Sequence, residues 1–220
     1  MTAPSDWCFP SDAVSFLTDL QANNTRAWFS ENKARHEHAV KRPAEVFCEE
    51  IRPRLEDLSG RPHASKIFRI YRDVRFSKDK TPYNANLRIS FSPIDPSGAA
   101  PAWFFSLEPD RLIFGAGCFG FDKPVLERYR QKIAGRGGAE LHTLLAHLSS
   151  RGIRLSAPDL KRVPKGFDTD QPHSELLLRK SLAGWCDTAD TSRATAPGLI
   201  AFSLTEYGQL KPLFDWLTDL

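Results

Sequence analysis

The residues of this chain best suited to chemistry lie between Lys66 and Lys80, where six lysines or arginines and two aspartates stand among aromatic and β-branched residues. This stretch has a local charge of +4, whereas the whole 220-residue chain carries a net charge of only +3. Guanidinium and ammonium groups concentrated in this way bind phosphate or carboxylate groups, whose oxygens accept their hydrogen bonds. The stretch is therefore the first candidate for a functional site.

The preferred hypothesis is a cradle for a small anionic or phosphorylated ligand, formed by this stretch and by a second basic loop, "LKRVPKGFD". The first stretch would contribute four cations and the second loop would face them with two lysines: Arg69, Arg75, Lys78 and Lys80, opposite Lys161 and Lys165. The full set of predicted ligand-binding residues is Arg69, Arg72, Asp73, Arg75, Lys78, Lys80, Tyr83, Lys161 and Lys165.

Two alternatives stay open beside the cradle. The first is a structural or interaction protein, in which an Arg–Asp lattice only pins the sheet to the acid-rich N-terminal helices. Arg72 would fall on an apolar face, and its burial requires a carboxylate or carbonyls, since an unpaired buried charge costs several kcal/mol. The second is an enzyme of unknown reaction that uses Asp73 with Lys80 or Tyr83. Flanking arginines would keep Asp73 ionised and make it a poor base near neutral pH.

The element that carries these side chains is predicted to be a β-strand. In "KIFRIYRDVRF", residues 66–76, apolar and polar residues alternate, which would place Phe68 and Phe76 on one mostly apolar face. The same residues are compatible with a helical face, but their β-branched and aromatic content favours a strand. "LRISF" alternates again, and "AWFFSLEPDRLIFGAG" is typical of a hairpin with "EPD" in its turn.

Helices are expected on both sides of these strands. Three N-terminal helices are predicted: one capped by Ser11 or Asp12, one capped by Asn24 or Thr25, and one with Pro43 in its first turn. Pro53 lies inside the third and is expected to kink or break it. Further helices are predicted over 122–133, 139–150 and 199–220, with a short one at "HSELLLRK". The sequence thus predicts a single α+β domain over residues 1–220, an antiparallel sheet packed by N-terminal and C-terminal helices.

Two sequence patterns that often mark functional sites, a glycine-rich motif and a pair of nearby histidines, do not indicate a site in this chain. Gly115, Gly117 and Gly120 match G-x-G-x-x-G, but the strand before them looks paired in a hairpin and no strand ending in an acid follows at the required distance. We interpret them as glycines of a strand, and the cofactor, if any, stays unknown from the sequence. His142 and His147 are five residues apart, a spacing that is not typical of metal ligands, and no metal site is predicted.

Composition indicates a cytoplasmic protein. Four cysteines are scattered along the chain, as is typical of reduced thiols rather than of a disulfide framework: Cys8, Cys48, Cys118 and Cys186. No signal peptide is recognised, and the most apolar window, "LIFGAGCFGF", is about half the ~20 residues of a membrane helix, so no membrane partner is expected. The sequence does not indicate an oligomeric state.

Strong nucleic-acid binding is not expected either. A chain of net charge +3 lacks the basic excess of most phosphate-tracking domains. With Phe68 and Phe76 on the apolar face of the expected strand, only Tyr71 and Tyr83 would be free to stack on bases. At most weak, salt-sensitive binding to single strands is predicted.

The pattern R-x-x-R-D-x-R-F-x-x-x-K-x-x-Y, running from Arg69 to Tyr83, resembles the signature of a bacterial and fungal domain-of-unknown-function family of conserved hypothetical proteins. The similarity extends to the N-terminal helical segment "FLTDLQANNTRAWFSENKARHEHAVKRPAEVF" and to "LKRVPKGFDTDQPHSELLLRK". The chain departs from the family pattern at Asn84, where a lysine is usual, and at Gln171, where many members have histidine. The resemblance implies no known activity, substrate or cofactor.

Overall fold

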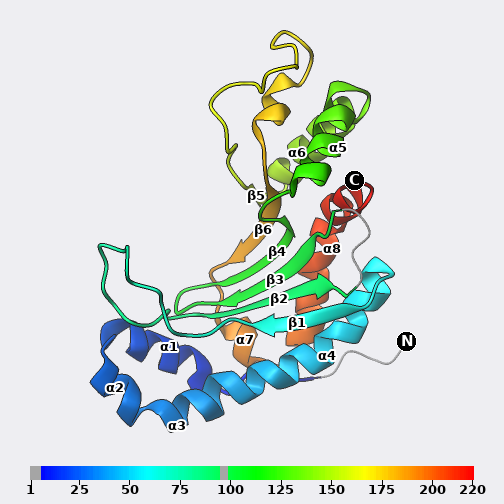
Figure 1. Cartoon of the computed structure of the whole chain (residues 1–220). Helices are drawn as coiled ribbons and strands as arrows, with labels where there is room; N and C mark the ends of the chain where they lie inside the picture. The colour runs from blue at the N-terminus through cyan, green and yellow to red at the C-terminus, as the bar shows by residue number, and fades with distance from the viewer. Residues whose placement is uncertain (1–5, 95–98) are drawn as a thin grey trace.

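A computed structural model describes residues 6–94 and 99–220 of the chain (Figure 1). Its centre is a six-stranded sheet with the strand order β1-β2-β3-β4-β6-β5, in which every neighbouring pair is antiparallel. The strands are β1 (His63–Ile67), β2 (Leu87–Pro93), β3 (Ala102–Leu107), β4 (Leu112–Cys118), β5 (Arg154–Leu155) and β6 (Leu182–Thr188).

Helices precede, interrupt and follow the sheet in the chain. They are α1 (Asp12–Ala22), α2 (Arg26–Glu31), α3 (Lys33–His36), the π-helical turn η1 (Glu37–Lys41), α4 (Arg42–Ser59), α5 (Lys123–Ala134), α6 (Gly137–Ser150), the 3₁₀ turn η2 (Ser174–Leu178), α7 (Ser192–Thr195) and α8 (Leu199–Thr218). The predicted α+β class, with an antiparallel sheet between N-terminal and C-terminal helices, is confirmed. The "EPD" hairpin is confirmed as β3 and β4.

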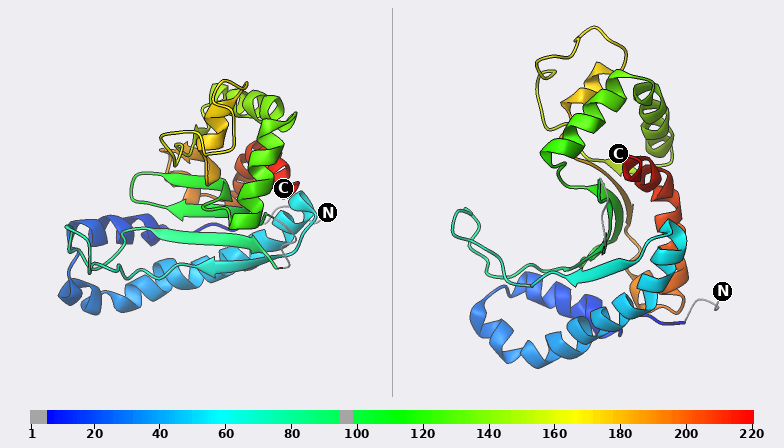
Figure 2. Two further views of the ribbon diagram at one scale, coloured as in Figure 1. Left: turned by 45° about the horizontal axis from the view of Figure 1, so that its top comes forward. Right: turned by 45° about the vertical axis from the view of Figure 1, so that its right-hand side comes forward.

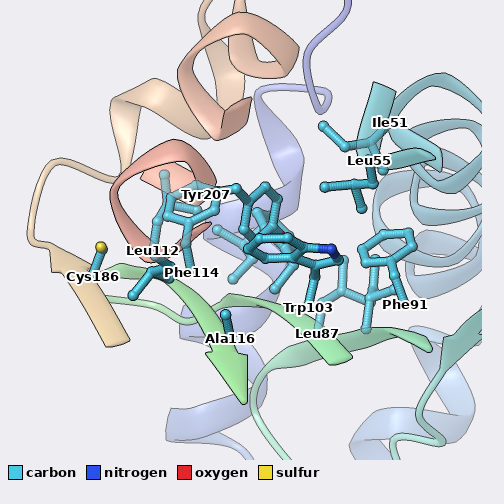
Figure 3. Packing of buried hydrophobic residues seen from close by; sticks show 14 of the residues in the cluster. Ile51, Leu55, Leu87, Phe91, Trp103, Leu112, Phe114, Ala116, Cys186 and Tyr207 are labelled. Atoms are coloured by element: carbon cyan, nitrogen blue, oxygen red, sulfur yellow. The ribbon is translucent and has the colours of Figure 1, made fainter. Parts of the chain in front are cut away.

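The core lies between one face of the sheet and the two long helices α4 and α8 (Figures 1 and 3). Alternate residues of each strand enter it, because successive side chains of a strand point to opposite faces. Trp103 of β3 is fully buried there and stacks on Phe214 of α8, with 4.2 Å between the ring centroids. On α4, Ile51 and Leu55 approach the same layer (Figure 3). The opposite face of the sheet is left for other contacts.

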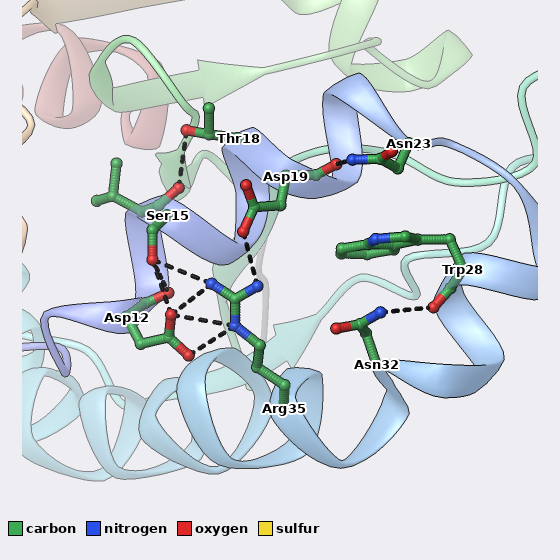
Figure 4. Close-up of polar contacts among 9 residues, drawn as sticks. Asp12, Ser15, Thr18, Asp19, Asn23, Trp28, Asn32 and Arg35 are labelled. Carbon is green, nitrogen blue, oxygen red and sulfur yellow. Dashed lines mark hydrogen bonds and ion pairs between the residues drawn. The ribbon is translucent and has the colours of Figure 1, made fainter.

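An ion-pair network holds the N-terminal helices together (Figure 4). Arg35 of α3 donates from Nη2 to Asp12 at 2.5 Å and from Nη1 to Asp19 at 2.7 Å, and both acids lie on α1. Its Nε donates to Asp12 as well, so one guanidinium uses most of its donors on one helix. Since α1 and α3 are joined by the short α2, this network sets the angle of the N-terminal corner, against which the basic loop described below is anchored.

The predicted strand over residues 66–76 is wrong beyond its first residues. The register pairs Ile67 with Ile89, and the partner strand β2 begins at Leu87. A strand needs a continuous ladder of backbone hydrogen bonds, and beyond Ile67 this ladder is interrupted. Only isolated backbone contacts continue, such as the bond from the N–H of Arg72 to the oxygen of Pro82 and the bridge between Tyr71 and Tyr83. Residues 68–86 therefore form a loop, in which Phe76 is 96% exposed instead of lying on an apolar face. Phe68 is 44% exposed.

Two further expectations about helices need correction. The break at Pro53 is wrong, because α4 continues through this residue. A proline inside a helix costs ~3 kcal/mol, and the burial of Phe47, Ile51 and Leu55 offsets that cost. The second expected helix is divided into α2, α3 and η1. Its cap is Thr25, whose hydroxyl accepts a hydrogen bond from the backbone N–H of Trp28.

Candidate functional site

The open face of the sheet carries a hollow of about 610 Å³. Side chains from β2, β3, β4, β5 and β6 line it, together with the two limbs of the loop 68–86. This volume is within the usual range for sites that hold small molecules. We call it the groove; its lining residues are Phe68, Arg69, Tyr71, Asn84, Asn86, Arg88, Ile89, Phe104, Phe105, Ser106, Glu108, Ile113, Phe119, Arg154 and Trp185.

Three aromatic rings form one part of the groove. The ring of Phe104 lies 4.3 Å from that of Phe119 and 5.6 Å from that of Trp185, measured between centroids, and Phe119 stacks on Trp185 at 5.5 Å. Phe119 is 65% exposed. Aromatic rings that stay open to solvent in a concave site provide a flat apolar surface for a ligand.

Glycines in β4 make room for this surface. A Cβ atom at Gly115 would lie only 2.3 Å from Cε3 of Trp185, so the indole can lie against the strand because residue 115 has no side chain. Gly117 has φ 144°, and a Cβ there would meet the backbone oxygen of Leu182 at 2.2 Å. The strand carrying them pairs with β3 and β6 in antiparallel fashion. Gly115 and Gly117 are thus strand glycines, as interpreted from the sequence, while Gly120 follows the end of β4, and the pattern is not the turn of a parallel βαβ unit.

Arginines give the groove its charge. Arg69 and Arg88 are exposed, and the guanidinium group of neither makes a hydrogen bond or an ion pair with any residue that the structure describes. Arg154 is engaged: it donates two hydrogen bonds to Asp187, at 2.8 and 3.0 Å, and its guanidinium carbon lies 5.7 Å from the centroid of the Trp185 ring. The Asp187 carboxylate raises the pKa of Arg154. Two guanidinium groups therefore remain available to a ligand.

The one carboxylate in the lining has partners of its own. Glu108 accepts a hydrogen bond from Nε of Arg111 at 2.9 Å and one from the hydroxyl of Ser106 at 3.3 Å. Because this acid is already neutralised by a neighbour outside the lining, the unpaired charge that faces the groove is positive.

The predicted basic cluster mostly folds onto itself. Arg72 donates from Nη1 to Asp79 at 2.6 Å and also to the backbone oxygen and the hydroxyl of Thr81. Arg75 pairs with Asp73 at 2.7 Å. The backbone N–H of Thr81 and the Arg72 guanidinium lower the pKa of Asp79 to about 2, and Arg75 lowers the pKa of Asp73. These pairs shape the loop 72–82 and do not reach the N-terminal helices.

Two other cations of the loop also lie outside the groove lining. Lys80 donates from Nζ to the backbone oxygen of Val74 at 2.9 Å, which closes the loop further. Lys78 is exposed. In the sequence prediction both were ligand-binding groups, and their position on the outer part of the loop makes them contributors to the local field rather than to direct contacts.

The base of this loop is anchored firmly. Tyr71 and Tyr83 form an isolated antiparallel bridge, and the ring of the buried Tyr83 stacks on Phe29 with 4.2 Å between centroids. Asn24 accepts a hydrogen bond from the backbone N–H of Tyr83 and donates one to its carbonyl, at 3.1 and 3.0 Å. Asn24 thereby holds Tyr83 next to the N-terminal corner, and the bridge keeps Tyr71, on the limb that carries Arg69, beside it.

A second hollow, of about 400 Å³, lies on the other side of the Phe68–Tyr71 segment. Its lining includes Lys41 and Glu45, from η1 and α4, and it shares Arg69 with the groove. A π-helical turn such as η1 often occurs near functional sites. Arg69 therefore borders two cavities at once.

The groove contains one of the residues predicted from the sequence and several that were not predicted. Among the described residues, Arg69 is the only member of the predicted set that lines the groove. Lys161 and Lys165 lie in the segment between β5 and η2, at the opposite end of the sheet from the loop 68–86 (Figure 2). Arg88 and Arg154 were not predicted. The signal for Arg88 was present, because it is the charged outward residue within the alternating "LRISF".

The fold and the groove define an antiparallel α+β protein with an arginine-bordered, aromatic-lined hollow on the face of the sheet that α4 and α8 leave free. The chain belongs to the family described as conserved hypothetical protein (DUF2461), whose model matches residues 12–216. This confirms the resemblance found in the sequence. A search of curated proteins found no match. Within the described residues, no helix combines the length and the apolar character needed to cross a bilayer.

Proposed function

We propose that the protein binds a small anionic ligand in the groove, through Arg69 and Arg88. The observation that carries the proposal is that both guanidinium groups line the same concave site while neither has a hydrogen-bonding or ion-pair partner among the described residues. A planar guanidinium offers two parallel donors to a carboxylate or phosphate, and such charge-assisted hydrogen bonds are among the strongest in proteins.

The aromatic side of the groove indicates that the ligand also carries a flat, apolar ring. Phe104, Phe119 and Trp185 offer a flat apolar surface within the same hollow. A ligand that combines an anionic group with a flat ring would use both sides of the site, since ring stacking adds about 0.5–1.5 kcal/mol beyond the burial of apolar area. Aromatic carboxylates and aryl phosphates are the simplest molecules of this kind.

Three other predicted cations would act on the ligand through the electric field rather than by contact. Arg75, Lys78 and Lys80 stand on the outer part of the loop 72–82. Charges that do not touch a ligand still raise its association rate by attracting it, an effect that salt screens. We therefore assign the direct contacts to Arg69 and Arg88, and the attraction of the anion to the loop.

The structural alternative keeps support from one part of the motif. Arg72 and Arg75 are both paired with carboxylates of their own loop. That arrangement fits a shape-holding role for these two arginines, whereas Arg69 takes no part in it. An acid–base role for Asp73 is weakened, because Arg75 lowers its pKa and a carboxylate with a low pKa is a poor base.

The test is a calorimetric titration with phenyl phosphate, using inorganic phosphate and phenol as probes for the two halves of the ligand. Wild type is compared with Arg69→Gln, Arg88→Gln and the double variant. The control is Arg52→Gln, an exposed arginine of α4, the helix that covers the other face of the sheet. Because a charge-assisted hydrogen bond contributes about 1.5–3 kcal/mol, each groove variant should weaken phenyl phosphate binding about tenfold or more.

The outcomes separate the hypotheses. Binding by wild type and by Arg52→Gln, lost in the double variant while its circular dichroism stays unchanged, supports the groove. Equal binding by the double variant and wild type would overturn it, as would the failure of folded wild type to bind any anionic probe. If the two single variants fail to fold, Arg69 and Arg88 are structural and the proposal is wrong.

A further inference from the structure

We propose that the protein holds a divalent transition-metal ion, with zinc as the best fit, between His142, His173 and Glu175. This cluster is separate from the groove and none of its members lines that hollow. His142 lies on α6, while Glu175 belongs to η2 and His173 precedes it (Figure 1). Two imidazoles and one carboxylate are a donor set that zinc binds readily, with water completing the shell.

The distances within the cluster are close to those that a metal requires. Nδ1 of His142 lies 3.3 Å from Oε1 of Glu175, and Nδ1 of His173 lies 3.9 Å from the same oxygen. One ligand atom from each of the three residues lies within 4.8 Å of the others. In a tetrahedral zinc site with bonds of 2.0–2.1 Å, the ligand atoms stand about 3.4 Å apart. Small rotations of the exposed side chains bring the three donors to that separation.

The backbone at His173 provides an independent sign of a functional position. Its φ is 62°, which makes it the only non-glycine residue with a positive φ among those that the structure describes. This left-handed conformation is strained for a residue with a side chain, and such strain clusters at functional sites. It brings the His173 ring to within 4.5 Å of the His142 ring, between centroids.

The backbone of His173 lies close to the first turn of α6. Gly138 lies in the first turn of α6, and a Cβ there would stand 3.6 Å from Cβ of His173. The carbonyl of His173 accepts a hydrogen bond from the N–H of Leu176, which starts η2. These contacts place His173 between the first turn of α6 and the start of η2.

The three ligand side chains are accessible to solvent, so water can complete the coordination of the ion. The side chains of His142 and Glu175 are 53% and 56% exposed, and that of His173 is 27% exposed. Water reaches the cluster, so three protein ligands and at least one water would surround the ion. When the metal binds, Nδ1 of His142 gives its lone pair to the ion and the ring proton resides on Nε2, while Glu175 exchanges its hydrogen bond for a metal bond.

The ion would join two parts of the fold that the chain connects only through a long segment. Residues 156–173 run between β5 and η2 without a helix or strand. A metal held by His142 on one side and by His173 and Glu175 on the other ties the end of this segment to α6. Binding that occurs only in the folded state stabilises it by mass action. Metal binding should therefore raise the melting temperature and protect the segment from proteases.

The test uses the full-length protein after chelator treatment and gel filtration. Cobalt(II) is titrated while its visible absorption is recorded, zinc is then added in competition, and melting is followed with and without zinc. The variants are His142→Ala, His173→Asn and Glu175→Gln; asparagine is chosen at 173 because it tolerates a positive φ. His147→Ala is the matched control, since His147 is another exposed histidine of α6.

We expect one equivalent of cobalt to bind and zinc to displace it, with a zinc-dependent rise in melting temperature. Each ligand variant should weaken binding at least about tenfold and remove the rise, whereas His147→Ala should match wild type. Without metal, all four variants should melt as wild type does. Unchanged zinc affinity in His142→Ala and in Glu175→Gln would overturn the proposal. So would the absence of stoichiometric binding to wild type, or binding that only the loss of a cysteine abolishes.

Discussion

Gly115 of β4 and Trp185 of β6 are paired across the antiparallel ladder, and the indole covers the glycine so closely that a Cβ at residue 115 would lie 2.3 Å from Cε3 and 2.4 Å from Cζ3 of the ring. This contact determines the height at which the tryptophan lies over the sheet. It therefore determines the shape of the aromatic side of the groove, because Phe119 stacks on the same indole.

Replacement of Gly115 by alanine should displace the Trp185 ring and destabilise the protein. Forcing a methyl group into a filled space costs about 1–3 kcal/mol, which urea unfolding followed by tryptophan fluorescence can measure. Gly120→Ala is the matched control, since a Cβ at residue 120 would meet no atom within 4 Å. That variant should stay within about 0.5 kcal/mol of wild type. Equal stabilities of the two variants would contradict the close contact.

The Arg35–Asp12 pair predicts an acid-dependent part of the stability. The Arg35 guanidinium lowers the pKa of Asp12 below its ordinary value of 3.8. The folded state therefore binds this proton less readily than the unfolded state does. The contribution is fully present above the unfolded-state pKa and is lost as the pH falls through the folded-state pKa. Asp12→Asn should lower the free energy of unfolding by about 1 kcal/mol near pH 6, a modest value because the pair is partly exposed. Near pH 3 the decrease should be much smaller.

The comparison requires urea unfolding of wild type and variant at both pH values. Asp57→Asn provides the control, because Asp57 is exposed on α4 and its side chain forms no hydrogen bond or ion pair with a described residue. Its effect should be small at both pH values. A cost for Asp12→Asn that does not shrink in acid would show that the Arg35 contact contributes nothing through charge.

A buried histidine predicts a second pH dependence, at a higher pH. His63 of β1 is 1% exposed, and burial lowers its pKa below 6.5. Its neutral form is favoured in the folded state, so the stability is complete above the unfolded-state pKa and decreases as the pH falls from about 6.5 towards the folded-state pKa. Between about pH 7.5 and about pH 5.5, the unfolding free energy of His63→Leu should therefore fall by less than that of wild type.

Part of that loss should persist in His63→Leu, because burial also lowers the pKa of His36. His38→Asn is the control, since His38 lies exposed on η1. Chemical unfolding at the two pH values provides the measurement. If the unfolding free energy of His63→Leu falls as much as that of wild type between the two pH values, protonation of His63 does not oppose folding.

The ion pairs of the loop 72–82 predict its susceptibility to trypsin, which cleaves after lysine and arginine. The Arg72–Asp79 pair spans the loop and closes its base, whereas Asp73–Arg75 joins residues two positions apart. Asp79→Asn should therefore open the loop and increase the initial cleavage rate several-fold, because proteolysis follows the population of the opened state. Asp73→Asn removes the same charge and should have little effect. Mass spectrometry of the first fragments would locate the cuts, and equal rates for the two variants would contradict this assignment.

Local interactions explain the parts of the fold that could be predicted from the sequence. Thr25 caps α2 and Asp122 caps α5, and in each case the hydroxyl or carboxylate accepts from a backbone N–H three residues later. The hairpin of β3 and β4 follows from two apolar runs and the turn between them. In each case the decisive contacts join residues close together in the chain, so the residue types and their spacing were sufficient.

The groove and the histidine cluster depend on contacts that the chain does not indicate locally. The alternation of residues 66–76 suggested a strand, but a strand requires a continuous ladder of backbone hydrogen bonds, and beyond Ile67 the pairing is reduced to isolated contacts. Arg69 and Arg88 border one hollow because the backbone N–H of Phe68 donates to the carbonyl of Arg88, which keeps the start of the loop beside β2. His142 meets His173 and Glu175 only because α6 packs next to the chain before η2. The sequence by itself determined the α+β class and most helix and strand positions, through capping, turn chemistry and apolar periodicity. The tertiary structure alone decided which charged and aromatic side chains share a cavity, because strand register and helix packing are set by interactions between distant segments.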